Sequence, residues 1–422
     1  MRILWISNIV FPEAKRLLKG VKSNLKISGG WLVASAYSLV KIADVNLAVV
    51  SVSREIDELF YAQGESGIEF FLIPYGKGNL RYNEEYESYW KTILDTYKAD
   101  IIHIHGTEYS QGLACMNVCG NTKVVLSIQG VMGEITKCFK GGLSQFDIIK
   151  STTVYDIFRG ESIMKQARIS KIRADVEVDY LKQVKYVIGR TGFDKRNILK
   201  INPNVKYFSV NESLRDEFYQ EPVWNYSRCT PHRIFFSQSI YPLKGLHILL
   251  KSLPSVLEKY PDTQVHVAGT NIAKADTLRD KLRITGYGNI LNSLIRKNGL
   301  TNAVVFTGSL DAEGMKREYL NANVFVCSSS CENSSNSISE AQILGVPCIA
   351  SIAGGNPDLV THMETGWLYE FDNIKALSNL ICDVFSGKAT IDSCQVVQMA
   401  RERHNKDKNT ADLLNVYHEV IG

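Results

Sequence analysis

Short apolar runs alternate with longer amphipathic stretches along the chain. In the first half, runs rich in Val, Ile and Leu predict strands at residues 2–7, 45–52, 68–74, 100–105, 123–128 and 185–189. Helical patterns lie between them, such as "WLVASAYSLVKIA" (31–43) and "EEYESYWKTILDTYK" (84–98). Nearly continuous apolar strands with helical crossovers are typical of a parallel sheet covered on both faces.

The alternation is interrupted at "YQEPVWNYSRCTPH" (219–232), which contains two prolines and no periodicity. It then restarts, with strands expected at 232–238, 263–269, 303–309, 323–329 and 346–351, and helices at 246–260, 275–299 and 313–322. We therefore expect an α/β chain with two doubly wound domains, residues 1–224 and 225–404, followed by a C-terminal helix at 405–422. Ligands of such sheets bind beyond the carboxyl ends of the strands, so the cleft between the domains is the expected site.

Composition narrows the class of protein. The 422 residues are 45% hydrophobic and 22% charged, as in ordinary globular proteins, and the net charge of +4 does not indicate nucleic-acid binding. The nine cysteines have neither zinc-site nor secreted-protein spacing, which favours a reducing cytoplasm. We expect no signal peptide and no membrane-spanning helix, so any membrane contact would be peripheral, on the cytoplasmic face.

The stretch "CENSSNSISEAQILGVP" (331–347) carries the most specific candidate chemistry. It follows a predicted strand and leads into a helix expected to begin near Ser337, where unpaired backbone amides favour a diphosphate. Glu340 could accept hydrogen bonds from ribose hydroxyls, and Glu332 could hold a second polyol on the opposite flank. The small residues expected to admit the ligand are Ser334, Ser335, Asn336 and Ser337. A plain capping box formed by Ser337 and Glu340 is the alternative.

The two glutamates, followed by "AQILGVPCIAS" (341–351) and "AGGNPDLVTHMETGWLY" (353–369), resemble the C-terminal signature of glycosyltransferase family 4. The resemblance is strong in the second domain and weak in the first. It implies the GT-B fold, with two Rossmann-like domains facing a cleft, and retaining, metal-independent sugar transfer. It also implies that the C-terminal helix crosses back to the N-terminal domain.

Lys244 ends the strand-to-helix loop "YPLKG" (241–245). Its ammonium could neutralise a diphosphate leaving group, although a solvated lysine is the alternative. The family usually has an arginine five or six residues earlier, where this chain has Gln238 and Ser239. This departure predicts that the usual pair of cations is incomplete.

Three places in the first domain are further candidates. Gly29 and Gly30 in "SGGW" would let the backbone approach a phosphate or sugar, with a plain turn as the alternative. His105 ends a predicted strand and would have a structural role or orient the acceptor, since two histidines alone do not make a metal site. Gln129 stands where many family members have a histidine that touches the donor sugar; it can form hydrogen bonds but cannot titrate.

Residues 137–173 combine basic and apolar side chains. The basic ones are Lys137, Lys140, Lys150, Arg159, Lys165, Arg168, Lys171 and Arg173. Such a segment suits an anionic membrane or a lipid-linked acceptor. A solvated helical insert that covers the core is the alternative.

These features predict a glycosyltransferase that moves a hexose from a nucleotide-diphosphate sugar to an acceptor hydroxyl of a surface polysaccharide or glycolipid, and the family resemblance implies that the transfer is retaining. Glu332 and Lys244 would be catalytic, and no metal or further cofactor is expected. Two alternatives stay open: another GT-B enzyme, either a nucleotide-sugar epimerase or a phosphorylase, and a nucleotide-sugar-binding protein without catalysis.

Overall fold

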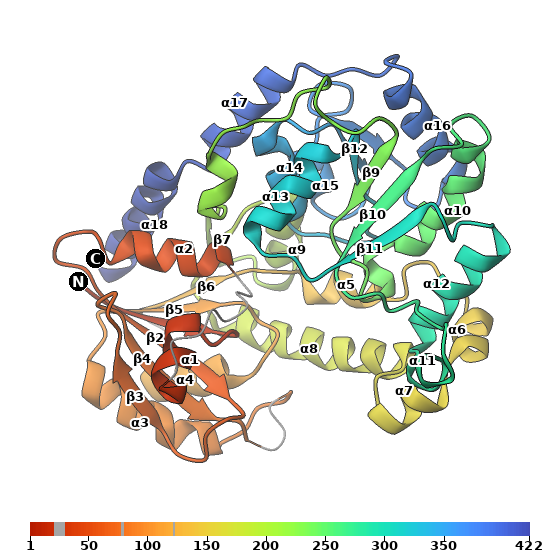
Figure 1. The fold of residues 1–422 in the computed structure, drawn as a ribbon. Helices are drawn as coiled ribbons and strands as arrows, with labels where there is room; N and C mark the ends of the chain where they lie inside the picture. The colour runs from red at the N-terminus through yellow and green to blue at the C-terminus, as the bar shows by residue number, and fades with distance from the viewer. Residues whose placement is uncertain (21–29, 77–79, 121–122) are drawn as a thin grey trace. The chain divides into compact units, whose positions relative to one another are not determined.

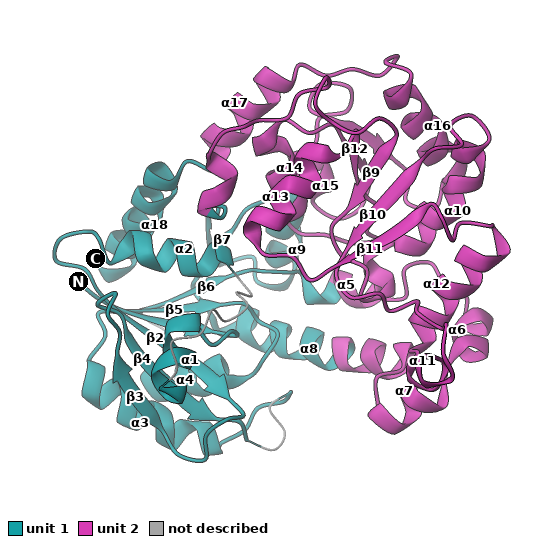
Figure 2. Cartoon of the chain, in the orientation of Figure 1, with its two compact units in different colours: residues 1–133, 171–215, 404–422 teal, residues 134–170, 216–403 magenta. Residues whose placement is uncertain are grey.

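The computed structural model describes residues 1–20, 30–76, 80–120 and 123–422 (Figure 1). The chain forms two compact units (Figure 2). Unit 1 comprises residues 1–133, 171–215 and 404–422, and unit 2 comprises residues 134–170 and 216–403. The sequence suggested an uninterrupted first domain to residue 224, whereas the structure groups 134–170 with unit 2.

Unit 1 is built on an eight-stranded sheet with the order β3-β4-β2-β1-β5-β6-β7-β8. The strands are β1 (Arg2–Ser7), β2 (Asn46–Ser53), β3 (Phe60–Gln63), β4 (Glu69–Pro74), β5 (Ile101–His105), β6 (Val124–Ser127), β7 (Tyr186–Gly189) and β8 (Lys206–Ser209). Strand β3 pairs antiparallel with β4, and the other pairs are parallel. The six predicted strands are confirmed, and β3 and β8 were missed.

Both faces of this sheet are covered because successive side chains of a strand point to opposite faces. In β1, Leu4 and Ile6 join one apolar cluster, and Ile3 and Trp5 join another. The first cluster includes side chains from α3 (Glu85–Tyr97), α4 (Gln111–Cys119) and α8 (Ile163–Gln183). The second includes side chains from α1 (Pro12–Lys19), α2 (Gly30–Leu39) and the C-terminal α18 (Lys406–Ile421). Helix α9 (Gly192–Ile201) joins β7 to β8.

Unit 2 contains a six-stranded parallel sheet with the order β11-β10-β9-β12-β13-β14. The strands are β9 (Arg233–Phe236), β10 (Gln264–Ala268), β11 (Val304–Gly308), β12 (Val324–Cys327), β13 (Cys348–Ser351) and β14 (Trp367–Tyr369). The five predicted strands are confirmed, and β14 was missed. Strands β9 and β12 are neighbours, which decides where the loops after them meet.

The helices of unit 2 are α6 (Gln145–Ser151), α7 (Val154–Arg159), α10 (Leu246–Leu257), α11 (Leu278–Arg283), α12 (Gly286–Lys297), α13 (Ala312–Asn321), α14 (Asn336–Leu344), α15 (Asn356–Leu359), α16 (Ile374–Phe385) and α17 (Ser393–Arg403). Helix α5 (Met132–Cys138) spans the division between the units in the chain. The helix predicted at 275–299 is two helices, because Thr285 caps α12 by accepting a hydrogen bond from the amide of Gly288. No helix among the described residues is long and apolar enough to cross a membrane.

Candidate active site

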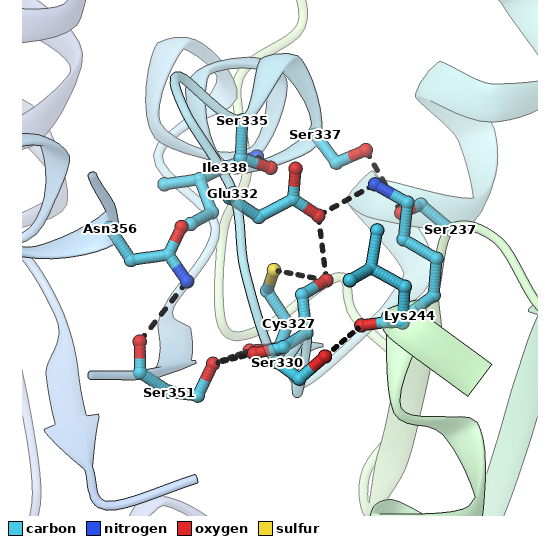
Figure 3. A network of polar contacts seen from close by, with 12 residues as sticks. Ser237, Lys244, Cys327, Ser330, Glu332, Ser335, Ser337, Ile338, Ser351 and Asn356 are labelled. Carbon is cyan, nitrogen blue, oxygen red and sulfur yellow. Dashed lines mark hydrogen bonds and ion pairs between the residues drawn. The ribbon is translucent and has the colours of Figure 1, made fainter. Parts of the chain in front are cut away.

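Lys244 and Glu332 form an ion pair in unit 2 (Figure 3). The Lys244 Nζ lies 2.6 Å from Glu332 Oε1, and the Ser329 hydroxyl donates to the same oxygen at 2.6 Å. Lys244 ends the 3₁₀ turn Pro242–Lys244 after β9, and Glu332 follows β12. The carboxyl ends of neighbouring parallel strands lie at the same edge of a sheet, so the two loops meet there.

Gly245 allows the two loops to approach so closely. Its φ is +76°, and a Cβ built on it would lie 1.7 Å from the carbonyl oxygen of Ser328. Any other residue would therefore clash with the backbone next to the site. The glycine of "YPLKG" fixes the position of Lys244 relative to the loop that carries Glu332.

The ion pair is largely shielded from water, with 20% of the Lys244 side chain and 13% of the Glu332 side chain exposed. Burial alone would lower the pKa of Lys244, but the Glu332 carboxylate outweighs that effect and raises it. Lys244 is therefore cationic at neutral pH. An ammonium has three N–H bonds, so Lys244 can donate to a phosphate oxygen while it still contacts Glu332.

A small polar pocket of about 20 Å³ lies at the ends of β9 and β12. Its lining residues are Phe236, Ser237, Gln238, Lys244, Val326, Cys327, Ser329, Glu332, Ser335 and Ser337. Among these described residues Lys244 is the only cation, and Gln238 lies where the family resemblance leads one to expect an arginine. The volume suits one or two water molecules, so a diphosphate would bind at the mouth of this pocket.

Helix α14 brings its first turn to this pocket. Its N-cap is Ser335, whose side chain accepts a hydrogen bond from the amide of Ile338, so the alternative of a capping box formed by Ser337 and Glu340 is wrong. The Ser237 hydroxyl donates to the Ser337 hydroxyl at 2.9 Å. Glu340 is buried in α14 and is not among the described residues that line the pocket. Ser334 and Asn336 are half-buried and do not line the pocket either.

The turn "AGG" (353–355) packs against the backbone of Glu332. The amide of Gly355 donates to the Glu332 carbonyl at 2.8 Å, and a Cβ on Gly354 would lie 1.9 Å from that oxygen. The Ser351 hydroxyl donates to the Ser329 carbonyl, and the Asn356 amide donates to the Ser351 carbonyl (Figure 3). The sequence analysis used this turn only as part of the family signature. It did not predict that Ser237, Ser329 and Ser351 form hydrogen bonds in the site.

Of the candidates in unit 1, His105 lines a different cavity, of about 50 Å³, and Gly30 and Gln129 do not line it. Gly29 lies outside the described residues, and Gly30 is the first residue of α2. Gln129 is half-buried after β6, and its carbonyl accepts a hydrogen bond from Arg190, which also pairs with Glu212. The sequence analysis missed this pair, although the position of Arg190 directly after a predicted strand was a usable signal.

His105 is the last residue of β5 and lines the cavity of unit 1, as do His103 and Trp31. Both ring nitrogens of His105 are buried and have no hydrogen-bond partner among the described residues. The ring of His103 contacts the hydroxyls of Tyr417 and Ser127, each at 2.6 Å. Burial lowers the pKa of His103 to about 3 and that of His105 well below its usual value, so both are neutral. The described residues contain no cluster of three or more metal-ligating side chains.

Residues 137–173 contribute an exposed apolar surface to unit 2. Its exposed side chains are Phe146, Ile149, Val154, Ile157, Phe158 and Met164. Helix α11 extends the surface with Leu278 and Leu282 and is held against α7 by a hydrogen bond from the Thr153 hydroxyl to the Ile284 carbonyl. The same stretches of the chain contain exposed basic residues, namely Lys150, Arg159, Lys165, Arg168, Lys274, Arg279, Lys281 and Arg283.

Residues 227–403 match the family model described as Glycosyl transferases group 1. This matched segment makes up most of unit 2 and includes Lys244 and Glu332. Curated relatives include a putative glycosyltransferase, YtcC of Bacillus subtilis, 25% identical over 292 residues, which are 68% of this chain and 64% of that protein. Another is a GDP-mannose-dependent monoacylated alpha-(1-6)-phosphatidylinositol monomannoside mannosyltransferase of Corynebacterium glutamicum, 26% identical over 56% of this chain and 60% of that protein. The chain spans less than two thirds of the length of these curated relatives.

Solved structures share the fold over nearly the whole chain. Anabaena HepE, in complex with UDP and glucose, aligns with a TM-score of 0.65 at 14% identity and covers 99% of this chain and 100% of that one. Sucrose-phosphate synthase from Thermosynechococcus elongatus aligns with a TM-score of 0.66 at 15% identity, covering 99% and 98%. The chain thus has the GT-B fold, with two Rossmann-like α/β units, as the sequence predicted.

Proposed function

We propose that the chain is a family 4 glycosyltransferase that transfers a hexose, with retention, from a nucleotide-diphosphate sugar to an acceptor hydroxyl. The acceptor would be a surface polysaccharide or a glycolipid. The match of residues 227–403 to a glycosyltransferase domain supports the reaction class. The relative that acts on a phosphatidylinositol mannoside supports a glycolipid acceptor.

The ion pair of Lys244 and Glu332 is the observation that carries this proposal. Lys244 would donate to the diphosphate and stabilise the charge that develops on it as the sugar leaves. Glu332, held by Ser329 and Lys244, would accept hydrogen bonds from hydroxyls of the donor sugar. Glu340 would hold the ribose, and the backbone of residues 334–337 the diphosphate.

Unit 1 would contribute to the sugar and acceptor side. Gly29, Gly30 and Gln129 would approach the donor, and His105 would contact the acceptor or the sugar. His105 is neutral and its ring nitrogens have no described partner, so it can exchange hydrogen bonds with hydroxyls without titrating near pH 7. HepE binds UDP and glucose, which supports a nucleotide sugar as donor.

The exposed apolar and basic surface of α6, α7 and α11 would contact the cytoplasmic face of an anionic membrane. Val154 and Phe158 of α7 are 84% and 88% exposed, and the three helices also carry exposed lysines and arginines. Stable peripheral binding needs two contributions. Apolar side chains insert between the lipid headgroups, and basic side chains are attracted to anionic lipid. This arrangement would place the enzyme beside a lipid-linked acceptor.

Product analysis with a panel of nucleotide sugars tests the proposal. We expect release of a nucleoside diphosphate, sugar transfer that depends on an acceptor, and full activity in excess EDTA, because phosphate neutralisation is assigned to Lys244 and backbone amides. Epimerised donor without acceptor, or a sugar phosphate as product, would indicate another reaction. Loss of activity in EDTA that manganese restores would contradict the role of Lys244.

A further inference from the structure

Helix α5 is attached to the loop that carries Glu332. The Ser330 hydroxyl donates to the carbonyl of Cys138, the last residue of α5, at 2.8 Å. Gly141 lies three residues after Cys138, and its carbonyl accepts a hydrogen bond from the ring of His247 at 2.7 Å. Burial lowers the pKa of His247 to about 4, so the neutral ring donates from Nε2. Two contacts therefore fix the end of α5 beside the loops of Lys244 and Glu332.

Two free thiols meet at this junction. Cys331, next to Glu332, is 3% exposed, and Cys138 is half-buried. The interaction between the two thiols lowers the pKa of Cys138 to about 7 and raises that of Cys331. Cys138 is therefore the more accessible thiol and the one that forms a thiolate at neutral pH, and a second thiol lies beside it. Neither residue has a part in the proposed transfer reaction.

We propose that Cys138 and Cys331 form a dithiol site that a low-molecular-weight disulfide oxidises to an intramolecular disulfide. The Cys138 thiolate attacks one sulfur of the reagent, forms a mixed disulfide and releases one thiolate. The Cys331 thiol then loses its proton, attacks the Cys138 sulfur and expels the second thiolate. In total, two protein thiols and one reagent disulfide give one protein disulfide and two reagent thiols.

The bond would change the donor site because Cys331 is joined directly to Glu332. A disulfide requires Cβ atoms about 3.5–4.5 Å apart and a dihedral angle near 90°, so its formation constrains the backbone on both sides. The loop would be fixed to α5, and Glu332 could adjust less to a donor. This consequence rests on the proposed function, whereas the thiol chemistry does not.

Cys115 and Cys119 provide an internal comparison. They lie four residues apart on α4 of unit 1, and their thiols also interact. Helix geometry keeps Cβ atoms at this spacing about 5–6 Å apart, too far for an unstrained disulfide. Cys394 is exposed and serves as a reference for a single accessible thiol.

The test is to treat the full chain with oxidised glutathione and to map its cysteines by mass spectrometry. We expect a cross-linked peptide pair containing Cys138 and Cys331 and a mass loss of two hydrogen atoms, reversed by dithiothreitol. Cys331→Ala should instead retain one glutathione on Cys138, and Cys138→Ser should show neither product. Cys119→Ser is the matched control and should still form the cross-link. A reduced Cys138 after Cys394 has reacted, or a mixed disulfide on Cys138 that persists in the unmodified sequence, would overturn the proposal.

The second measurement is acceptor-dependent sugar transfer by the reduced and the oxidised protein, with calorimetric titration of UDP and GDP beside it. We expect about tenfold slower transfer after oxidation with nearly unchanged affinity for the nucleoside diphosphate, and no change of the transfer rate in Cys138→Ser. Equal transfer rates in both forms would overturn the effect on the donor site. If neither form bound a nucleoside diphosphate, the proposed function would fail, while the mapped cross-link would still decide the thiol chemistry.

Discussion

Lys244 and Glu332 are partners in a largely buried ion pair. Both side chains are largely closed to water, and each would lack its partner if the other were removed. A buried charge without a partner costs more than the net gain from the pair itself. Structural and ligand-binding roles can therefore be separated by removing the two charges one at a time and then together.

We expect Lys244→Met to lower the free energy of unfolding by about 1–3 kcal/mol, because the Glu332 carboxylate stays behind without its cation. The double variant Lys244→Met/Glu332→Gln should regain most of this loss but should still bind a nucleoside diphosphate more weakly than the unmodified protein. Urea unfolding and calorimetric titration give the two quantities. Lys251→Met, on the exposed side of α10, is the control and should change neither. Nucleotide affinity that recovers in the double variant would show that Lys244 has only a structural role.

At the residue scale, the sequence identified these two side chains but not their contact. Each follows a predicted strand, so each was expected at the carboxyl end of a parallel sheet. Their pairing depends on β9 and β12 being neighbours in the sheet, although the two strands are far apart in the sequence.

 Strands β10 and β11 come between β9 and β12 along the chain, and a hydrophobic pattern does not specify the order of strands within a sheet.

At the scale of single elements, the N-terminus of α14 is set by Ser335 and not by Ser337. Ser335→Ala should lower the free energy of unfolding by about 1 kcal/mol, because the amide of Ile338 loses its hydrogen-bond acceptor. Ser337→Ala should cost less, since Ser337 is not the cap and loses only the contact with the Ser237 hydroxyl. Urea denaturation of the two variants makes the comparison. A larger loss of stability for Ser337→Ala than for Ser335→Ala would contradict the assignment of Ser335 as the N-cap of α14.

The exposed surface of α6, α7, α11 and the start of α8 gives a prediction about membranes. Binding to anionic vesicles should fall as salt rises, because exposed charges are screened over about 8 Å at physiological ionic strength. Replacing Lys165, Arg168 and Lys171 with Glu should weaken it further, as should Phe158→Ser. Sedimentation with vesicles of phosphatidylglycerol or phosphatidylcholine measures vesicle binding. Lys91→Glu, on the exposed surface of α3, is the control and should not change this binding. Equal recovery with both lipids would favour the alternative of a solvated helical insert.

Element boundaries followed from the sequence where an apolar run was long. Strands β3 and β8 were missed because each has four residues and alternates or exposes its side chains, and β14 has only three. The break between α11 and α12 at Ile284 and Thr285 was missed because the helical pattern continues on both sides of it. Its signal was Thr285 three residues before Gly288, which is too weak to end a helix by itself.

At the scale of the whole molecule, each of the two units is built from segments that are not contiguous in the sequence. Residues 134–170 belong to unit 2 because Leu143, Ile148 and Ile163 are buried in its core. Residues 404–422 belong to unit 1, where the Tyr417 hydroxyl accepts a hydrogen bond from the Trp5 indole and shares another with the His103 ring. The sequence shows that these side chains are apolar or aromatic, but it does not show which of two similar cores buries them.

The central claim is that the stretch from Glu332 to Glu340 binds the donor, and calorimetric titration of a nucleoside diphosphate against Glu340→Ala and Glu332→Ala tests it most directly. A hydrogen bond to a charged group contributes about 1.5–3 kcal/mol, or about 10–150-fold in affinity. We predict that loss for Glu340→Ala, which removes the ribose contact, and nearly unchanged affinity for Glu332→Ala, which should depress sugar transfer instead. A melting curve for each variant controls for folding. Unchanged nucleotide affinity in a folded Glu340→Ala protein, or equal losses in both variants, would contradict the account.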